Sequence, residues 1–118
     1  MTTATTVDDF FAALGRQGHA PMLRRVTGTI RFDLDHGRDT DHFTVAVAKG
    51  DVSVSRRTSA ADTVIHTDRH LFERLITGRA NATASMLRGL LGVSGDMELA
   101  TLTRRLFAAV GSSSARER

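Results

Sequence analysis

Histidine side chains are the first candidates for chemistry in this 118-residue chain, because imidazole is a common metal ligand and general base. His66 and His70 are four positions apart, the spacing that places two imidazoles on one face of a helix. They lie across a predicted boundary between a strand and a helix, so the helical geometry does not apply to them. His36 and His42 flank an aspartate-rich turn, which favours a solvated loop over a metal site. We therefore predict no metal site.

Motifs for covalent catalysis and phosphate binding are missing from the sequence. There is no Gly-x-Ser-x-Gly nucleophile turn, no Gly-x-Gly-x-x-Gly loop, and no lysine after a glycine-rich loop. The chain has no cysteine, which excludes thiol catalysis, disulfides and zinc–thiolate sites. Asp96 is expected to cap the start of a helix rather than to act in catalysis. With no pairing of nucleophile and base at a sensible spacing, we predict that the protein is not an enzyme and needs no cofactor.

The charge of the chain is small and dispersed. Sixteen basic residues nearly balance thirteen acidic ones, and the net charge is +3. Nucleic-acid-binding domains show a basic stripe with interleaved aromatic residues, whereas this sequence has no Trp, no Tyr and no long basic run. These features argue against a nucleic-acid partner and are compatible with transient contact with an anionic membrane surface. No signal peptide or membrane-spanning run is visible, so we expect a cytoplasmic protein.

Hydrophobic periodicity divides the chain into helices and strands. Helical spacing of apolar residues predicts helices over 7–14, 71–76, 81–88 and 99–110, with a short helical turn at 21–23. Strict alternation predicts strands over 28–34, 43–47, 52–54, 63–66 and 91–93. In the helix over 81–88, Ala84 and Leu87 are expected on one side. The alternation does not decide which of Val64 and Ile65 points inward.

This order of elements predicts a single α+β domain. The first three strands form two successive hairpins, which indicates an antiparallel sheet, and the helices are expected to bury one of its faces. We expect the domain to span residues 1–110 and residues 111–118 to form a flexible tail.

Five segments, in this order and spacing, resemble the sterol carrier protein type 2 family. The most specific is GLLGVSGD at 89–96, followed by MELA at 97–100, which is similar to the family's Gly-x-Leu-x-Val/Ile-x-Gly-Asp strand-to-helix segment. The others are TGRAN at 77–81, ADTVI at 61–65, GTIRFDL at 28–34 and GDV at 50–52. Together they cover about residues 26–107, most of the chain.

The resemblance implies a five-stranded, mostly antiparallel sheet that helices cover on one face, with an apolar tunnel between them. It also implies non-catalytic binding or transfer of a fatty acid, fatty acyl-CoA or sterol-like ligand. Apolar residues of the sheet and of the later helices are the candidate walls, although each could equally be ordinary core. The candidate ligand-binding residues are Phe32, Phe43, Val45, Leu75, Ile76, Met86, Leu87, Leu91, Leu102, Leu106 and Phe107.

Other interpretations of the same sequence remain open. The domain could be a ligand-free accessory or dimerisation module, as a monomer or homodimer, or it could hold the substrate of a lipid or quinone enzyme. Arginine is the side chain best suited to bind a carboxylate or phosphate headgroup. The candidates for that role are Arg56, Arg57, Arg79 and Arg88.

Overall fold

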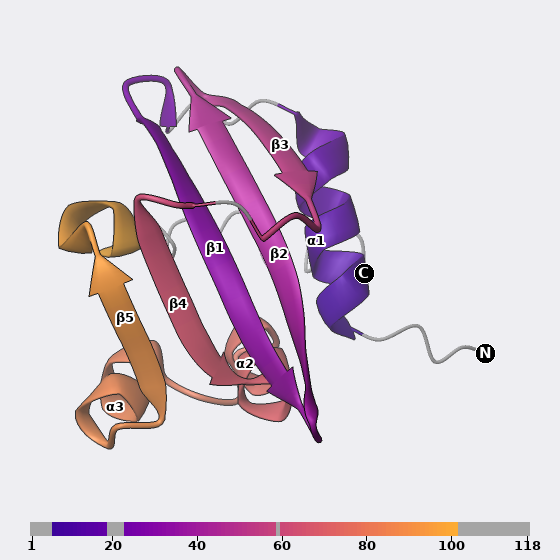
Figure 1. Cartoon of the computed structure of the whole chain (residues 1–118), viewed down its shortest axis with the longest axis vertical. Helices are drawn as coiled ribbons and strands as arrows, with labels where there is room; N and C mark the ends of the chain where they lie inside the picture. The colour runs from indigo at the N-terminus through magenta and orange to yellow at the C-terminus, as the bar shows by residue number, and fades with distance from the viewer. Residues whose placement is uncertain (1–5, 19–22, 59, 102–118) are drawn as a thin grey trace.

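A computed structural model of the chain describes residues 6–18, 23–58 and 60–101 (Figure 1). The elements are α1 (Thr6–Gln17), β1 (Thr27–His36), β2 (Asp39–Ala48), β3 (Asp51–Ser55), β4 (Thr63–Asp68), α2 (Arg69–Ile76), α3 (Ala82–Leu87) and β5 (Leu91–Gly95). A last helix begins at Met97 and continues to Thr101, where the described residues end. The predicted tail at 111–118, most of the predicted helix over 99–110 and the start of the turn at 21–23 lie outside the described residues.

The five strands form one sheet in the order β3-β2-β1-β4-β5. The pairs β1–β2, β2–β3 and β4–β5 are antiparallel, and the central pair β1–β4 is parallel. The two hairpins close through tight turns, where Gly37 (φ 65°) and Lys49 and Gly50 (φ 52° and 92°) adopt the left-handed backbone that such turns require. The predicted α+β class and the mostly antiparallel, five-stranded sheet are confirmed.

The described parts of the connection from β3 to β4, residues 56–58 and 60–62, cross the face of the sheet that is turned away from the helices (Figure 1). The side chain of Thr44 lies beneath it, and its hydroxyl donates a 2.7 Å hydrogen bond to the carbonyl of Arg57. At the far end, the amide of Asp62 donates to the carbonyl of Thr29. This crossing brings β4 alongside β1 in the same direction. It also explains why an outward-facing residue of β2 is buried.

The other face of the sheet carries the core. Ile30, Phe32 and Leu34 of β1 are at most 1% exposed, as expected from the alternation in the sequence. The ring of Phe11, from α1, lies at the centre of this core. It stacks on Phe43 with ring centroids 4.1 Å apart. Aromatic side chains therefore fill the middle of this core. Between α1 and the β2–β3 side of the sheet they leave an open hollow of about 280 Å³, whose lining residues include Phe11, Phe43 and Arg56.

The burial pattern shows which residue of β4 points inward and which side of α3 is buried. Ile65 is 4% exposed and points into the core, whereas Val64 is only partly buried. Ala84 and Leu87 do share one side of α3, but it is the side that faces solvent, and Leu87 is 83% exposed. Ser85 is the buried residue of this short helix because its hydroxyl is satisfied by the carbonyl of Asn81, 2.8 Å away.

Candidate functional site

A partly open cavity of about 230 Å³ lies at the β4–β5 side of the sheet. Its walls come from the inner face of these two strands, from α2 and α3, and from the last helix. The described residues that line it are Ile65, Phe72, Leu75, Ala82, Thr83, Met86, Leu91, Val93, Met97, Ala100 and Thr101.

The strand wall follows from the two-residue period of a sheet. Ile65 of β4 and Val93 of β5 are directly paired, so their side chains stand side by side on the inner face. Leu91 lies on the same face two residues earlier, while Gly92 and Ser94 point to the opposite face. The alternation that predicted β5 therefore also places Leu91 and Val93 in the wall of the cavity.

Helix α2 presents Phe72 and Leu75, three residues apart, to the same space. The helix begins where it does because the Asp68 side chain accepts hydrogen bonds from the amides of His70 and Leu71. Phe72 is completely buried and stacks on Phe11 at 5.6 Å, so the same ring belongs to the core and to the cavity wall.

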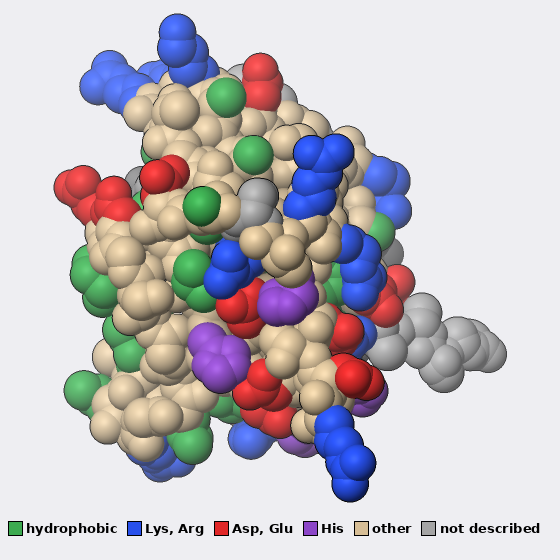
Figure 2. All heavy atoms as spheres, in the orientation of Figure 1, with side chains coloured by type: hydrophobic (Ala, Val, Ile, Leu, Met, Phe, Trp, Pro, Cys, Tyr) green, Lys and Arg blue, Asp and Glu red, His purple; other side chains and the backbone are tan. Residues whose placement is uncertain are grey.

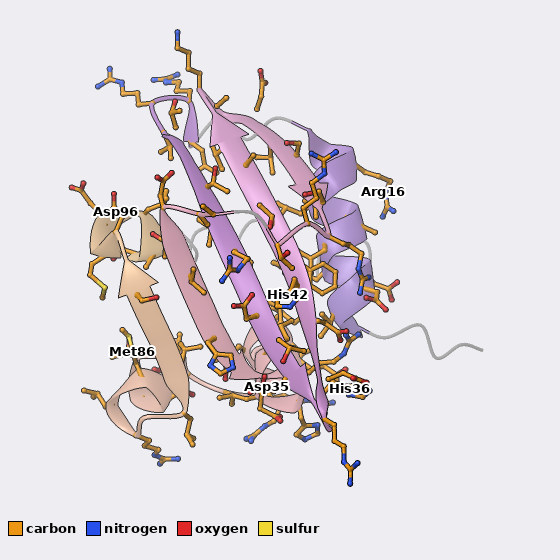
Figure 3. All side chains as sticks on the ribbon, in the orientation of Figure 1. Arg16, Asp35, His36, His42, Met86 and Asp96 are labelled. Carbon is orange, nitrogen blue, oxygen red and sulfur yellow. The ribbon has the colours of Figure 1, made fainter. Side chains whose placement is uncertain are left out.

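Helix α3 is held by hydrogen bonds at both ends. The Asn81 side chain accepts a 2.9 Å hydrogen bond from the amide of Ala84 at the first turn. After the helix, the Thr67 hydroxyl donates a 2.8 Å hydrogen bond to the carbonyl of Leu90, which fixes the turn into β5 against β4. These contacts set Met86 at the edge of the cavity, 40% exposed, where Figure 3 shows it on α3 beside β5.

The last helix closes the upper side of the cavity. The Asp96 side chain accepts hydrogen bonds from the amides of Glu98 and Leu99, which confirms that this carboxylate is a helix cap. Leu99 is buried against Gly28 of β1, where an added Cβ would come within 2.8 Å of a leucine methyl. Glycine at position 28 thus lets the helix approach the sheet closely.

The cavity offers apolar contact and little else. The only polar side chains among its described lining residues are the hydroxyls of Thr83 and Thr101, and no charged side chain is among them. Such a surface suits an apolar ligand and provides no general acid, base or nucleophile–base pair. Its volume is below the roughly 300–1,000 Å³ of pockets that enclose a drug-sized ligand. A fatty chain would fill it only with its tail, or after side chains at its edge move.

The sequence-predicted wall residues fall into four groups. Leu75, Met86 and Leu91 line the cavity. Phe32, Phe43 and Val45 lie in the packed core, and Ile76 packs against that core outside the described lining. Leu87 faces solvent. Leu102, Leu106 and Phe107 lie outside the described residues.

Sequence reasoning did not select several residues that line the cavity. Phe72 and Val93 carried a usable signal, since Phe72 shares a helix face with Leu75 and Val93 alternates with Leu91. The small residues Ala82 and Ala100 carried none, because an alanine beside a cavity has the same helical spacing as an alanine in a solid core.

Two of the four histidine candidates, His42 and His66, lie on the opposite, outer face of the sheet, whereas His36 ends β1 and His70 belongs to α2. His42 Nδ1 is 2.7 Å from Asp33, which also accepts hydrogen bonds from Arg31, and His66 Nε2 is 2.8 Å from Asp35. Figure 3 shows His42 and Asp35 on this face, away from Met86. Burial acts to raise the pKa of Asp33, but the hydrogen bonds from Arg31 and His42 outweigh it and hold the pKa below its ordinary value. Hydrogen bonds from His66 and Thr40 likewise lower the pKa of Asp35.

These pairs are structural and form no metal centre. Within residues 6–18, 23–58 and 60–101, no three His, Asp or Glu side chains come together in a way that could hold an ion.

The described helices are too short or too polar to cross a bilayer.

The four candidate headgroup arginines separate into two pairs. Arg56 and Arg57 follow β3, at the sheet edge opposite β5 and the cavity. Arg56 is already engaged, with its guanidinium 4.5 Å from the centre of the Phe43 ring and 3.7 Å from Asp8. Arg79 and Arg88 are exposed residues on either side of α3, next to the cavity.

Comparison with known proteins identifies this architecture. Residues 10–108 match the model of the SCP-2 sterol transfer family. The chain belongs to this family. Among curated protein sequences, none matches it at a significant level.

Solved structures of the SCP-2 type show the same fold at low sequence identity. The sterol carrier protein domain 2 of Helicoverpa armigera superposes with a TM-score of 0.72 at 16% identity, over 95% of this chain and 96% of that chain. Sterol Carrier Protein-2 from Aedes aegypti, determined in complex with the C16 fatty acid palmitate, gives 0.72 at 19% identity, over 90% and 97%.

A larger enzyme contains a similar fold. The stereoselective inverting sec-alkylsulfatase Pisa1 from Pseudomonas gives a TM-score of 0.68 at 13% identity, over 89% of this chain but only 16% of the sulfatase. At such identities the likeness establishes the fold alone.

Proposed function

We propose that this protein binds, and transfers between membranes or proteins, a lipid-like ligand such as a fatty acid, a fatty acyl-CoA or a sterol-like molecule. The observation that carries the proposal is the apolar cavity, with no charged side chain among its described lining residues, in a member of the SCP-2 sterol transfer family. The palmitate complex of the Aedes aegypti relative supports it. The protein itself acts without catalysis.

The apolar end of the ligand occupies the cavity between Leu75, Met86 and Leu91 in this proposal. Met86 and Met97 stand at its edge with 40% and 52% exposure. Because a methionine side chain is unbranched and flexible, these two residues are the natural ones to move when a longer chain enters. The polar end of the ligand leaves the cavity beside α3, where Arg79 and Arg88 are the cationic groups available to a carboxylate or phosphate.

The driving force is burial of hydrocarbon, at about 0.8 kcal/mol per methylene. This value predicts that each methylene added to the ligand tightens binding about fourfold, until the chain fills the cavity. A headgroup-dominated site would not show such a dependence.

A chain-length series tests the proposal. Purified protein is titrated with a fluorescent fatty acid, which saturated fatty acids of increasing length then displace, and native mass spectrometry records any lipid that co-purifies. We expect saturable binding, a regular gain in affinity with length and a plateau at the length that fills the cavity. Absence of saturable uptake together with absence of co-purified lipid would refute lipid binding.

A second candidate function is that of a domain that holds the apolar substrate of a partner enzyme. The observation that favours it is the match to one part of the alkylsulfatase chain. This candidate predicts the same cavity binding. It differs in predicting that turnover by the partner enzyme, and not lipid exchange between vesicles, depends on the cavity residues.

A further inference from the structure

The large apolar side chains that the described part of the protein leaves exposed are gathered in one region. They are Leu87 at 83%, Leu90 and Met97 at 52% each, and Met86 at 40%. Met86 and Met97 line the cavity, and Leu87 and Leu90 flank the turn that joins α3 to β5. Figure 2 shows several separate hydrophobic side chains along the side of the molecule that carries α3 and β5, with basic side chains at the lower edge. One exposed leucine is ordinary on a protein surface, but a cluster at a cavity edge indicates an interaction surface.

The turn that carries the two leucines, residues 87–90, is held in a defined conformation. Gly89 adopts a φ of 76°, and the amide of Leu90 donates a 2.9 Å hydrogen bond to the carbonyl of Ser85. The carbonyl of Leu90 in turn accepts from the Thr67 hydroxyl. Because the backbone is fixed from both sides, Leu87 and Leu90 project from the surface as a consequence of the fold.

The segment that carries the two leucines is basic. Residues 74–95 include Arg74, Arg79 and Arg88 but no aspartate or glutamate, although the chain has thirteen acidic residues. All three arginines are exposed. Asp96 and Glu98, on either side of Met97, are also exposed, so the absence of acidic residues belongs to the segment that carries the leucines and not to the whole cluster. Exposed leucines in a segment with cations and no anions match the order of layers in an anionic bilayer, where phosphate groups cover the acyl chains.

We propose that the 87–90 turn docks on anionic membranes. Leu87 and Leu90 insert among the upper acyl chains, and Arg79 and Arg88 contact lipid phosphates. Because Met86 is next to Leu87, this orientation turns the edge of the cavity toward the bilayer. A lipid would then pass between the cavity and the bilayer without crossing water. The docking itself stands on the exposed turn and its charge; its role in lipid delivery rests on the proposed function.

Vesicle flotation with wild-type protein and four variants tests the docking. The vesicles contain either phosphatidylcholine alone or equal amounts of phosphatidylcholine and phosphatidylglycerol. Leu87→Gln and Leu90→Gln should each weaken binding to the mixed vesicles about tenfold, the lower end of the value of burying a leucine. Arg88→Glu should weaken it more than fivefold, since one basic residue near such a surface contributes about fivefold. Arg38→Glu, the same change at the exposed β1–β2 turn, is the matched control and should have little effect.

Several results would overturn the docking. The first is that wild-type protein does not bind the mixed vesicles. The second is that Arg38→Glu and Arg88→Glu lose vesicle binding to the same extent. The third is that light scattering shows self-association, which the leucine variants abolish, and that no vesicle binding is seen. The last result would assign the surface to a second copy of the chain. Titration of the wild-type protein with fluorescent fatty acid, without vesicles, tests the proposed lipid binding separately. Thermal melts verify that every variant is folded.

Discussion

Replacement of Ala82 by leucine tests whether the cavity is open space. Ala82 lines the cavity, whereas Ala84, two residues later on the same helix, faces solvent. Alanine and leucine have similar helix propensities, so Ala84→Leu is a matched control for the effect of the change on the helix. Leucine adds three carbon groups, which at about 0.8 kcal/mol each would stabilise the protein by up to about 2 kcal/mol if all are buried in empty space.

Two measurements follow from that value. For a domain of this size, 2 kcal/mol corresponds to a rise of about 8 °C in Tm. The same three carbons occupy space that three ligand methylenes would use, so fatty-acid affinity should fall by up to about 60-fold. Ala84→Leu should change stability by no more than about 0.5 kcal/mol and leave fatty-acid affinity unchanged.

The opposite result would show that our account of the cavity is wrong. A side chain forced into a region that is already filled costs about 1–3 kcal/mol. If Ala82→Leu lowers Tm and fatty-acid affinity does not change, the interior beside α3 is solid and the ligand, if any, binds elsewhere.

Three further predictions concern the elements that form the site. Phe72→Ala should destabilise the protein by about 3–5 kcal/mol in urea denaturation, because a fully buried ring leaves both the aromatic core and the cavity wall. Asp68→Ala should cost about 1 kcal/mol through loss of the α2 cap, whereas Asp68→Asn, which keeps an acceptor oxygen, should cost little. The lowered pKa of Asp33 means that its carboxylate stabilises the fold above the ordinary value of 3.8, and that this contribution is lost as pH falls through the folded pKa. Asp33→Asn should therefore lower the urea midpoint at neutral pH and reduce its fall on acidification below pH 3.8.

Each of these predictions has an outcome that contradicts it. A loss of less than 1 kcal/mol for Phe72→Ala would mean that α2 does not pack on the core as described. Equal costs for the two Asp68 variants would mean that the cap hydrogen bonds are not what matters. An unchanged acid dependence in Asp33→Asn would show that the pairs with Arg31 and His42 do not persist in solution.

The fold was predictable from the sequence where a period continued long enough to be unambiguous. Strand β1 alternates over four inward positions and α1 has four apolar residues on one face, and both appear where they were expected. Helix α3 has only six residues, too few for periodicity to define its buried side. There a hydroxyl satisfied within the helix, that of Ser85, decided which side is buried.

The candidate site was predictable only in part, because a cavity depends on how side chains meet. The sequence marks Phe32 and Phe43 as large inward residues, equally able to line a tunnel or to fill it. In the structure the ring of Phe11, from α1, lies against both, at 5.3 Å and 4.1 Å. The middle of the sheet is thus occupied. The apolar cavity lies to one side of it, toward β4 and β5, and a more open hollow that includes Arg56 lies to the other side. No local pattern specifies such a long-range contact.

The parallel pairing of β1 with β4 joins two parts of the sheet that are separate in sequence. Strands β1 to β3 form a meander of neighbours in sequence, with α1 packed on it, whereas the cavity is built almost entirely from the later residues 63–101. Within that later part, β5 is an edge strand and α3 is a short helix with one buried residue, and such weakly packed elements open at a lower free energy than the whole protein unfolds. Amides of α3 and β5 should therefore exchange with deuterium well before those of β1 and β2. Brief opening of this edge would widen the cavity while the meander stays intact, so a lipid bound there, as proposed, would leave without global unfolding.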